Sequence, residues 1–243
     1  MNSENLEGRN AVLEAFKAGR TIDKLYVQEG LRDGTIQRII KEAKKNGTVI
    51  TFLKKERMDQ IAQVQAHQGV IAVAAEVPYA TVDEMLEDAA AKGEDPFIIL
   101  LDEIEDPHNL GAIIRTANAA GAHGVVITKR HAATMTATVA KASAGAINYT
   151  KVAKVTNLGT EIENLKKKGL WIVAADMDGK EMYDLDLKGP IGLVIGNEGK
   201  GVGRLIREKC DFLASIPLRG EIESLNASVA AGVLSYEIVR QRR

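Results

Sequence analysis

Short hydrophobic runs and helical periodicity follow one another through the first third of the chain. The apolar and β-branched runs predict three strands, at residues 24–27, 49–53 and 70–75. Between them, apolar positions recur at helical spacing and predict helices at residues 10–17, 35–45 and 55–61. Three short strands interleaved with helices are typical of a small α/β layer.

The pattern breaks at residues 77–82, where Val77, Pro78 and Tyr79 end the alternation. An acidic segment follows, and its spacing predicts a short helix at residues 83–91. We therefore divide the chain into a first unit of residues 1–76, a linker of residues 77–82 and a second unit of residues 83–243.

The second unit contains six nearly continuous apolar runs. Such runs are typical of strands covered on both faces, as in parallel sheets. They predict strands at residues 97–101, 124–128, 152–155, 170–174, 191–195 and 212–216, separated by helices at 110–120, 136–142, 158–168, 203–209 and 227–240. This order predicts a doubly wound α/β fold, a parallel sheet with helices on both faces.

Composition excludes several classes of protein. The 243 residues are 45% hydrophobic but only 4% aromatic, so the cores are expected to be aliphatic. A single cysteine, Cys210, excludes an internal disulfide and a cysteine-rich zinc site, and the four histidines lack ligand spacing, so no metal is expected. No apolar run approaches the roughly 20 residues of a membrane helix. A cytoplasmic protein without a membrane anchor is the expectation.

Charge is distributed unevenly along the chain. Residues 1–76 carry 12 Lys and Arg against 10 Asp and Glu, and residues 96–243 carry 19 against 17. Residues 77–95 carry one Lys against six acids, and this balance of −5 outweighs the +2 of each flanking unit to give the net charge of −1. Both units are therefore mildly basic, which permits nucleic-acid binding through local patches.

Polar residues follow a buried strand in the segment 106–118, DPHNLGAIIRTAN. Asn109 is predicted to cap the helix that follows, because its side chain can accept from free backbone N–H groups. The small residues of this helix, Gly111 among them, allow close packing against another backbone. Arg115 alone would more often be a solvated cation than a functional group.

Four glycines lie in and after the segment 193–202, LVIGNEGKGV, between a strand and a helix. Their spacing fits neither the G-x-G-x-x-G fingerprint of dinucleotide-binding proteins nor a phosphate-binding P-loop. A flexible turn is one interpretation. The carboxylate of Glu198 within this turn favours a ligand-binding loop instead.

The segment 216–230, IPLRGEIESLNASVA, leads from a strand into an alanine-rich helix. Ser224 and Asn226 are both candidates to cap that helix. A helix N-terminus also offers free N–H groups and partial positive charge to a phosphate or carboxylate, so capping and function are compatible here.

In this order the three segments resemble the signature motifs of the SpoU (TrmH-like) family of RNA 2′-O-methyltransferases. The resemblance implies a C-terminal SPOUT domain with a deep trefoil knot, S-adenosylmethionine as cofactor and a homodimer. The first unit resembles the extension found in the branch that methylates a guanosine of 23S ribosomal RNA, through residues 7–10 (EGRN) and 67–69 (HQG). That extension is a small α/β RNA-binding domain similar to certain large-subunit ribosomal proteins.

The resemblance also assigns site residues. The catalytic set comprises Asn109, Arg115, Glu198, Ser224 and Asn226, and the S-adenosylmethionine site comprises Gly196, Ile216, Leu218 and Leu225. Because arginine essentially never loses its proton, we expect Arg115 to hold a phosphate and stabilise the developing alkoxide. The base is then Glu198, a phosphate oxygen or a water.

The expected substrate is a guanosine of 23S ribosomal RNA, with transfer RNA as the alternative within the same chemistry. A non-catalytic RNA-binding factor for ribosome assembly is the alternative from another class. It would be favoured by replacement of the catalytic residues, but Asn109, Arg115, Glu198 and Asn226 are all present. A nicotinamide-dependent enzyme is disfavoured because the glycine fingerprint is missing.

Overall fold

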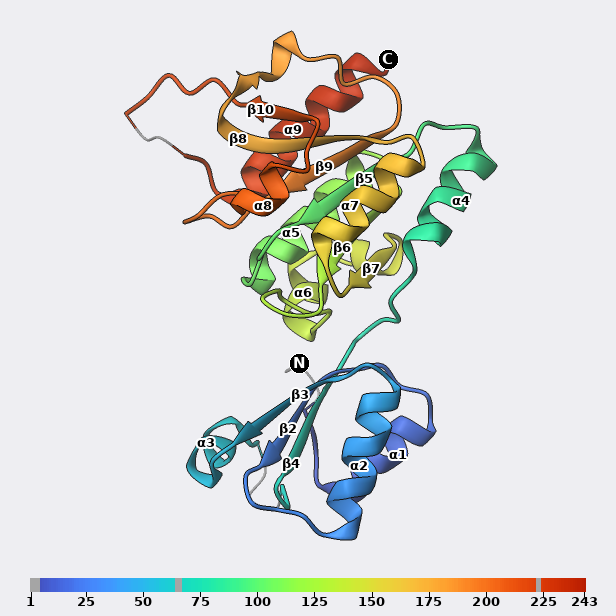
Figure 1. Ribbon diagram of the computed structural model, residues 1–243, viewed down its shortest axis with the longest axis vertical. Coiled ribbons are helices and arrows are strands. Elements are labelled where there is room, and N and C mark those ends of the chain that lie inside the picture. Colours follow the sequence, from blue (N-terminus) through green and yellow to red (C-terminus); the bar gives the residue numbers. More distant parts are fainter. Residues whose placement is uncertain (1–4, 64–66, 222–223) are drawn as a thin grey trace. The chain divides into compact units, whose positions relative to one another are not determined.

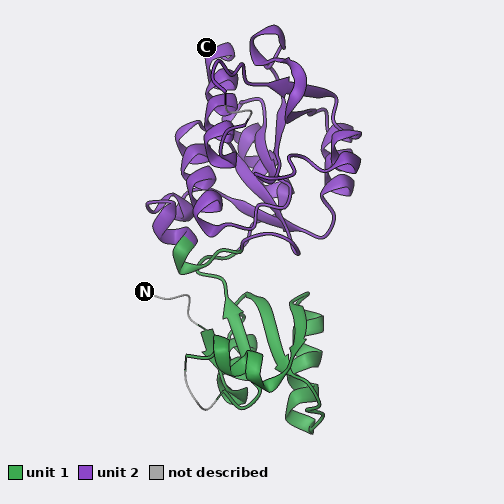
Figure 2. Cartoon of the chain, turned by 90° about the vertical axis from the view of Figure 1, so that its left-hand side faces the viewer, with its two compact units in different colours: residues 1–78, 134–138 green, residues 79–133, 139–243 purple. Residues whose placement is uncertain are grey.

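The computed structural model describes residues 5–63, 67–221 and 224–243. The chain divides into two compact units (Figure 2). The first contains residues 1–78 together with residues 134–138, and the second contains residues 79–133 and 139–243. The short segment 134–138 is an addition to the first unit that periodicity did not indicate, and the linker at 77–82 stays a prediction.

The first unit has a four-stranded sheet with the order β1-β4-β2-β3. Its strands pair antiparallel except for β2 and β3, which are parallel. The prediction of three strands missed β1, because three residues are too few to show a period. The elements are β1 (Asn5–Glu7), α1 (Arg9–Lys17), β2 (Ile22–Gln28), α2 (Gly34–Lys45), β3 (Val49–Leu53), α3 (Lys55–Ile61) and β4 (Val70–Ala74).

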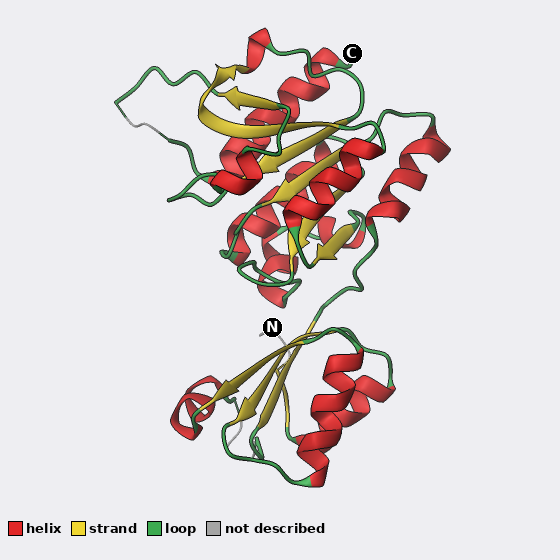
Figure 3. Ribbon diagram, viewed as in Figure 1, coloured by secondary structure: helices red, strands yellow, loops and turns green. Residues whose placement is uncertain are grey.

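Helices α1 and α2 lie together on one side of this sheet (Figure 3). Phe16 of α1 and Ile39 of α2 are buried over Leu25 and Val27, which point to the same face of β2. Helix α2 begins at Asp33, whose carboxylate accepts hydrogen bonds from the N–H groups of Thr35 and Ile36. The first unit therefore has its own aliphatic core.

The second unit has a six-stranded sheet with the order β10-β8-β9-β5-β6-β7, in which every neighbouring pair is parallel. The predicted parallel α/β sheet is confirmed. The elements are α4 (Val82–Lys92), β5 (Phe97–Leu101), α5 (Pro107–Ala119), β6 (Gly124–Thr128), α6 (Ala137–Ala142), β7 (Val152–Val155), α7 (Leu158–Lys167), β8 (Trp171–Glu181), β9 (Ile191–Ile195), α8 (Arg204–Arg207), β10 (Phe212–Ser215) and α9 (Ala227–Gln241), with short 3-10 turns at Ala146–Asn148 and Met182–Asp184.

Both faces of this sheet are covered by helices. Ile98 and Leu100 of β5 belong to the core that α4 and α7 complete, and the alternate residue Ile99 points to the opposite face. Helices α5 and α9 pack on each other and on that opposite face, so α7 and α9 lie on opposite sides of the sheet (Figure 1). Double coverage explains why the strands read as continuous apolar runs.

Strand β8 and helix α4 also differ from the sequence prediction. Strand β8 continues to Glu181, whereas the apolar pattern ended at Ala174. Beyond Ala174 the register with β10 shifts, and Lys180 and Glu181 pair with Ala214 and Ser215. These polar residues extend the strand without adding to the core. Helix α4 starts at Val82, because Thr81 and Glu84 form a reciprocal capping box that fixes its first turn.

Gly111 brings α5 unusually close to the end of α6. A methyl group at Gly111 would lie 2.4 Å from the Cβ atom of Ala142 and 2.9 Å from the backbone oxygen of Val139. Real Cβ contacts are essentially never shorter than 3.0 Å. The close packing expected from the small residues of this helix is therefore present.

No helix in the described part of the chain is long and apolar enough to cross a membrane. The trefoil knot implied by the family resemblance stays a prediction.

The contact at Gly111 predicts that Gly111→Ala lowers the free energy of unfolding of the second unit by about 1–3 kcal/mol, because backbone must shift. Urea unfolding followed by the fluorescence of Trp171, the single tryptophan, measures this. Gly232→Ala in α9 is the matched control, since its nearest atom would be 3.9 Å away. The control should gain about 0.5–1 kcal/mol. Equal stabilities for Gly111→Ala and the wild type would contradict the packing argument.

Candidate functional site

The candidate site lies at the carboxyl edge of the second sheet. Strands β5, β9 and β10 run parallel, so the segments that follow them leave the sheet at the same edge. Ligands of open α/β sheets bind at this edge. The three sequence motifs follow these three strands.

Three polar side chains from these segments hydrogen-bond to one another. The Asn109 amide Nδ2 donates to Glu198 Oε1 at 2.8 Å, and the Asn226 amide Nδ2 donates to Asn109 Oδ1 at 3.0 Å. Asn226 Nδ2 also donates to Glu198 Oε1, which closes a ring. We call these three residues the Asn–Glu–Asn ring. One residue from each of the three motifs thus takes part in this ring, and the catalytic role of these residues stays a prediction.

Asn109 does not cap α5, contrary to the sequence prediction. The helix begins at Pro107 with Asp106 as its N-cap, and the Asp106 carboxylate accepts from the His108 N–H at 2.8 Å. Proline suits the first helical position because its fixed φ is helical and its missing N–H is not needed. Asn109 consequently lies inside the first turn, where its side chain is buried and points into the ring.

Asn226 caps α9 and belongs to the ring with different atoms. Its Oδ1 accepts from the N–H groups of Ser228 at 2.9 Å and Val229 at 3.3 Å, while its Nδ2 donates within the ring. The helix therefore fixes the orientation of the Asn226 amide. Ser224, the other candidate, lies two residues before the cap and does not cap the helix.

The glycine-containing segment 196–203 is a tight turn rather than a flexible loop. Asn197 and Gly201 exchange backbone hydrogen bonds of 3.1 and 2.8 Å, and the Asn197 side chain accepts from the Gly199 N–H. A Cβ atom at Gly196 would lie 2.2–2.3 Å from the backbone of Gly201 and Val202. Only glycine fits there, and the turn places Glu198 at its tip.

Asp102 ties this turn to the end of β5. Its Oδ2 accepts from the Gly203 N–H at 2.8 Å, and the Asn197 Nδ2 donates to the Glu103 carbonyl at 3.0 Å. Burial raises the pKa of the Asp102 carboxyl above its usual range, and the Gly203 hydrogen bond opposes this only in part. Sequence reasoning missed Asp102 and Asn197, although Asp102 directly follows a buried strand.

The remaining predicted residues have no side-chain contact with the ring among the described hydrogen bonds. Arg115 is exposed and follows Asn109 by six residues, so it points from a different face of α5. Ser224 is exposed. Among the cofactor candidates, Gly196 is buried, Ile216 is half-buried, and Leu218 and Leu225 are 37% and 36% exposed.

Within the described part of the chain, no group of three or more His, Cys, Asp or Glu side chains is placed to hold a metal ion. The Cys210 thiol donates to the Ile206 carbonyl, and burial raises the pKa of this thiol to about 12. Its thiolate is therefore not accessible near neutral pH.

Comparison with known proteins gives the same two-part division. The model of the SpoU rRNA methylase family matches residues 96–236, and a model for RNA 2′-O ribose methyltransferase substrate binding matches residues 6–80. The protein YacO of Bacillus subtilis (strain 168), described as a TrmH family tRNA/rRNA methyltransferase, is 50% identical over 236 residues. That alignment covers 97% of this chain and 94% of YacO.

Two solved structures are also similar. The SpoU methyltransferase AviRb of Streptomyces viridochromogenes, in complex with the cofactor AdoMet, is 26% identical with a TM-score of 0.61. The alignment covers 98% of this chain and 89% of AviRb. The TrmH/SpoU tRNA modifying enzyme of A. aeolicus is 30% identical with a TM-score of 0.55, but covers only 60% of this chain and 75% of its own.

The environment of Asp102 predicts a pH-dependent effect of Asp102→Asn. A carboxyl whose pKa is raised on folding stabilises the fold at low pH, and this contribution is lost as pH rises through the raised pKa. The neutral Asn keeps an acceptor for Gly203. The difference in free energy of unfolding between Asp102→Asn and the wild type should therefore favour the variant more at pH 7.5 than at pH 4. Urea unfolding at the two pH values measures this difference.

Asp102→Leu is the control for the hydrogen bond itself. It leaves the Gly203 N–H without this acceptor, so it should be less stable than Asp102→Asn by about 1–3 kcal/mol at both pH values, since neither variant titrates at this position. A difference between Asp102→Asn and the wild type that does not change with pH would show that Asp102 does not titrate as inferred.

Proposed function

The chain belongs to the SpoU (TrmH-like) family of RNA methyltransferases, and from this premise we propose that it transfers a methyl group from S-adenosylmethionine to a ribose 2′-oxygen of RNA. The observation that carries the proposal is the Asn–Glu–Asn ring, which joins all three motifs at the ligand-binding edge of the sheet. A protein that only bound RNA would not require a carboxylate held in this way.

The residues proposed for the cofactor suit its chemistry. Leu218 and Leu225 expose apolar side chains, and with half-buried Ile216 they offer apolar surface for an adenosine group. Gly196 follows β9 at the same sheet edge and packs on the backbone of Gly201 and Val202, so no side chain occupies this position. AviRb, which matches 98% of this chain, binds AdoMet. When bound, the cofactor supplies an electrophilic methyl group attached to a sulfonium, and the sulfur departs as a neutral thioether.

Glu198 is our proposed proton acceptor. Both amide donors of the ring contact its Oε1, and its Oε2 accepts no hydrogen bond from the described residues. As the 2′-oxygen bonds to the methyl carbon, the carbon–sulfur bond breaks and the hydroxyl proton becomes strongly acidic. A carboxylate can then accept it although carboxylates are weak bases. Asn109 and Asn226 orient the carboxylate for this step.

Arg115 is our proposed phosphate clamp. It makes no hydrogen bond or ion pair with the described residues, and its fixed positive charge can hold the phosphate next to the reacting ribose. Ser224 would add a hydroxyl donor at the same end of α9. Because Arg115 is exposed on a different face of α5 from Asn109, we propose a homodimer in which it completes the site of the partner.

The proposed substrate is a guanosine of 23S ribosomal RNA. Support comes from the family description, which names ribosomal RNA, and from the substrate-binding module at residues 6–80. The tRNA modifying enzyme of A. aeolicus matches only 60% of this chain. Mapping ribose methylation in ribosomal and transfer RNA from cells with and without the protein tests the assignment. A methylation that disappears from transfer RNA alone would overturn it.

The Gly196 turn predicts that Gly196→Ala weakens S-adenosylmethionine binding by at least about tenfold, because the methyl group displaces the backbone of the turn. Isothermal titration calorimetry measures the affinity. Gly199→Ala, in the same turn, is the matched control, since its nearest atom would be 3.6 Å away. Unchanged binding by Gly196→Ala would remove this turn from the cofactor site.

For Arg115 we expect that Arg115→Ala keeps its fold and cofactor affinity but loses methyl transfer by about 100-fold or more, as expected when a charge that stabilises the transition state is removed. Radiolabelled methyl transfer to unmodified ribosomal RNA measures this. Asn118→Ala, another exposed position of α5, is the control and should retain full activity. Turnover near that of the wild type would remove Arg115 from the mechanism.

Mixing inactive variants tests whether Arg115 acts across the dimer. If it serves the partner's site, Arg115→Ala and Asn226→Ala chains form hybrid dimers with one intact site each. Random pairing then restores about a quarter of the wild-type activity. A mixture that stays inactive although hybrids form would place Arg115 in the site of its own chain.

A further inference from the structure

Two short motifs at opposite ends of the first unit lie side by side in the fold. Strand β1 precedes Arg9 and pairs with β4, which follows Gln68, so the sheet brings the two residues together. The Arg9 backbone N–H donates to Gln68 Oε1 at 3.1 Å, and the Arg9 Nε donates to the Gln68 carbonyl at 3.2 Å. The methyl-transfer chemistry proposed above uses neither residue.

The turn at residues 67–69 is held in one conformation. His67 is buried, and its Nδ1 accepts from the Gly69 N–H at 3.0 Å. The other ring nitrogen, Nε2, therefore carries the proton of a neutral imidazole and donates to Asp59 Oδ1 at 2.8 Å. Gln68 and Gly69 have φ values of 51° and 75°, and a Cβ atom at Gly69 would lie 2.2 Å from Leu31. These hydrogen bonds and backbone angles define the shape of the turn at residues 67–69.

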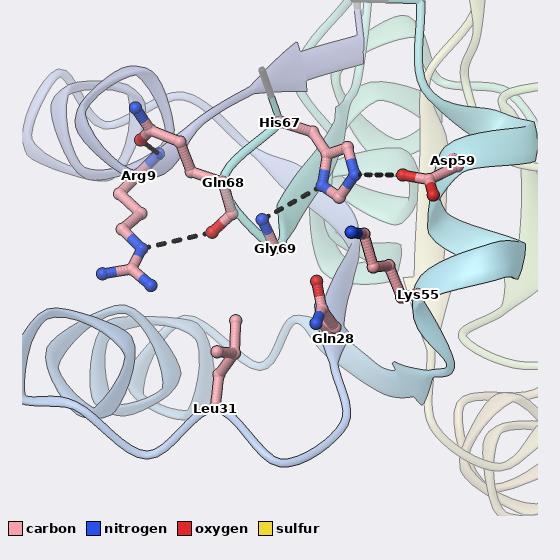
Figure 4. Close-up of a pocket in the computed structure, with 8 residues that line it drawn as sticks. All are labelled: Arg9, Gln28, Leu31, Lys55, Asp59, His67, Gln68 and Gly69. Atoms are coloured by element: carbon pink, nitrogen blue, oxygen red, sulfur yellow. Dashed lines mark hydrogen bonds and ion pairs between the residues drawn. The ribbon is translucent and has the colours of Figure 1, made fainter. Parts of the chain in front are cut away.

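A cavity of about 540 Å³, widely open to solvent, adjoins this turn. Its volume lies in the range of small-molecule sites. Figure 4 shows side chains from α1, β2 and α3 converging on it. The lining residues are Arg9, Gln28, Leu31, Lys55, Asp59, His67, Gln68 and Gly69.

Some polar side chains of the cavity already have hydrogen-bond or ion-pair partners in the protein, and others do not. Arg9 forms an ion pair with Asp33 at 2.9 Å, and Asp59 is bonded to His67. The side chains of Lys55 and Gln28 make no hydrogen bond or ion pair with any residue in 5–63, 67–221 or 224–243. One ammonium group and one half-buried amide therefore remain to bind a ligand.

These groups match the parts of one nucleotide. An ammonium binds a phosphate as a point charge, and an amide offers a donor and an acceptor to the edge of a base. Leu31 provides an apolar surface on which the face of a base can lie. Proteins that read RNA sequence usually hold bases splayed out of single-stranded loops in this manner.

We infer that this cavity binds one unstacked nucleotide of the RNA substrate, with its phosphate on Lys55 and its base edge on Gln28. The inference rests on the proposed function and adds a recognition site to it. It gives the first unit a part in choosing the target sequence, separate from methyl transfer.

Lys55→Ala tests the phosphate contact in the full-length protein. Binding to an unmodified transcript of 23S ribosomal RNA should weaken about tenfold, since one charge-assisted contact is lost. The slope of log affinity against log salt concentration should fall by about one. Lys41→Ala removes the same charge from an exposed position of α2 outside the cavity and should change neither quantity.

Gln28→Ala tests the base contact. It should weaken binding to the target transcript but not to an unrelated RNA, whereas Lys55→Ala weakens both. Both variants should raise the KM for RNA and keep the wild-type kcat and S-adenosylmethionine affinity. Wild-type affinity in both variants would overturn the inference. So would binding of free guanosine monophosphate that Lys55→Ala abolishes without affecting RNA, because the occupant would then be a free nucleotide.

The outcomes separate this inference from the proposed function. If the wild-type protein methylates RNA and both cavity variants do so with an unchanged KM, only the cavity assignment fails. If the wild-type protein methylates neither ribosomal nor transfer RNA, the proposed function fails whatever the cavity binds.

Discussion

The hydrogen-bonded ring of Asn109, Glu198 and Asn226 is the interaction on which the rest of the site depends. Its members are 89, 117 and 28 residues apart in sequence, so each bond joins segments that leave different strands. Breaking it would leave the buried Asn109 amide without its partners, at a cost of about 1–3 kcal/mol. The ring fixes the first turn of α5, the turn after β9 and the start of α9 relative to one another.

Close backbone contacts hold the segments that carry the ring in place. Gly196 lets the chain fold back on itself directly after β9, and Gly111 lets α5 approach the end of α6. Asp102 then ties the turn to β5 through Gly203. Because these contacts involve backbone, the site cannot adjust by rotating a side chain, and the position of Glu198 is set by the fold of the sheet edge.

The two units suit different tasks. The second brings a carboxylate and two amides together at one sheet edge, where we propose methyl transfer. The first builds a rigid turn from His67, Gln68 and Gly69 beside an ammonium and an amide that have no described partners. Separate recognition and chemistry would let changes at Gln28 alter the choice of target, and changes at Lys55 alter the affinity for RNA, without altering the reaction.

The sequence by itself determined most of the strands, the parallel sheet and the three motifs, because buried strands require continuous apolar runs and helices require a period of 3.6 residues. It did not determine that Asn109 lies inside α5. Asp106, Pro107 and Asn109 are all residues that favour a helix start, and the sequence does not show which of them begins the helix. Nor did it reveal the polar half of β8, the pairing of Arg9 with Gln68, or the tie between Asp102 and Gly203. These features depend on contacts between segments that are distant in sequence. A local sequence pattern does not show which distant residue will form a hydrogen bond with a given donor or acceptor.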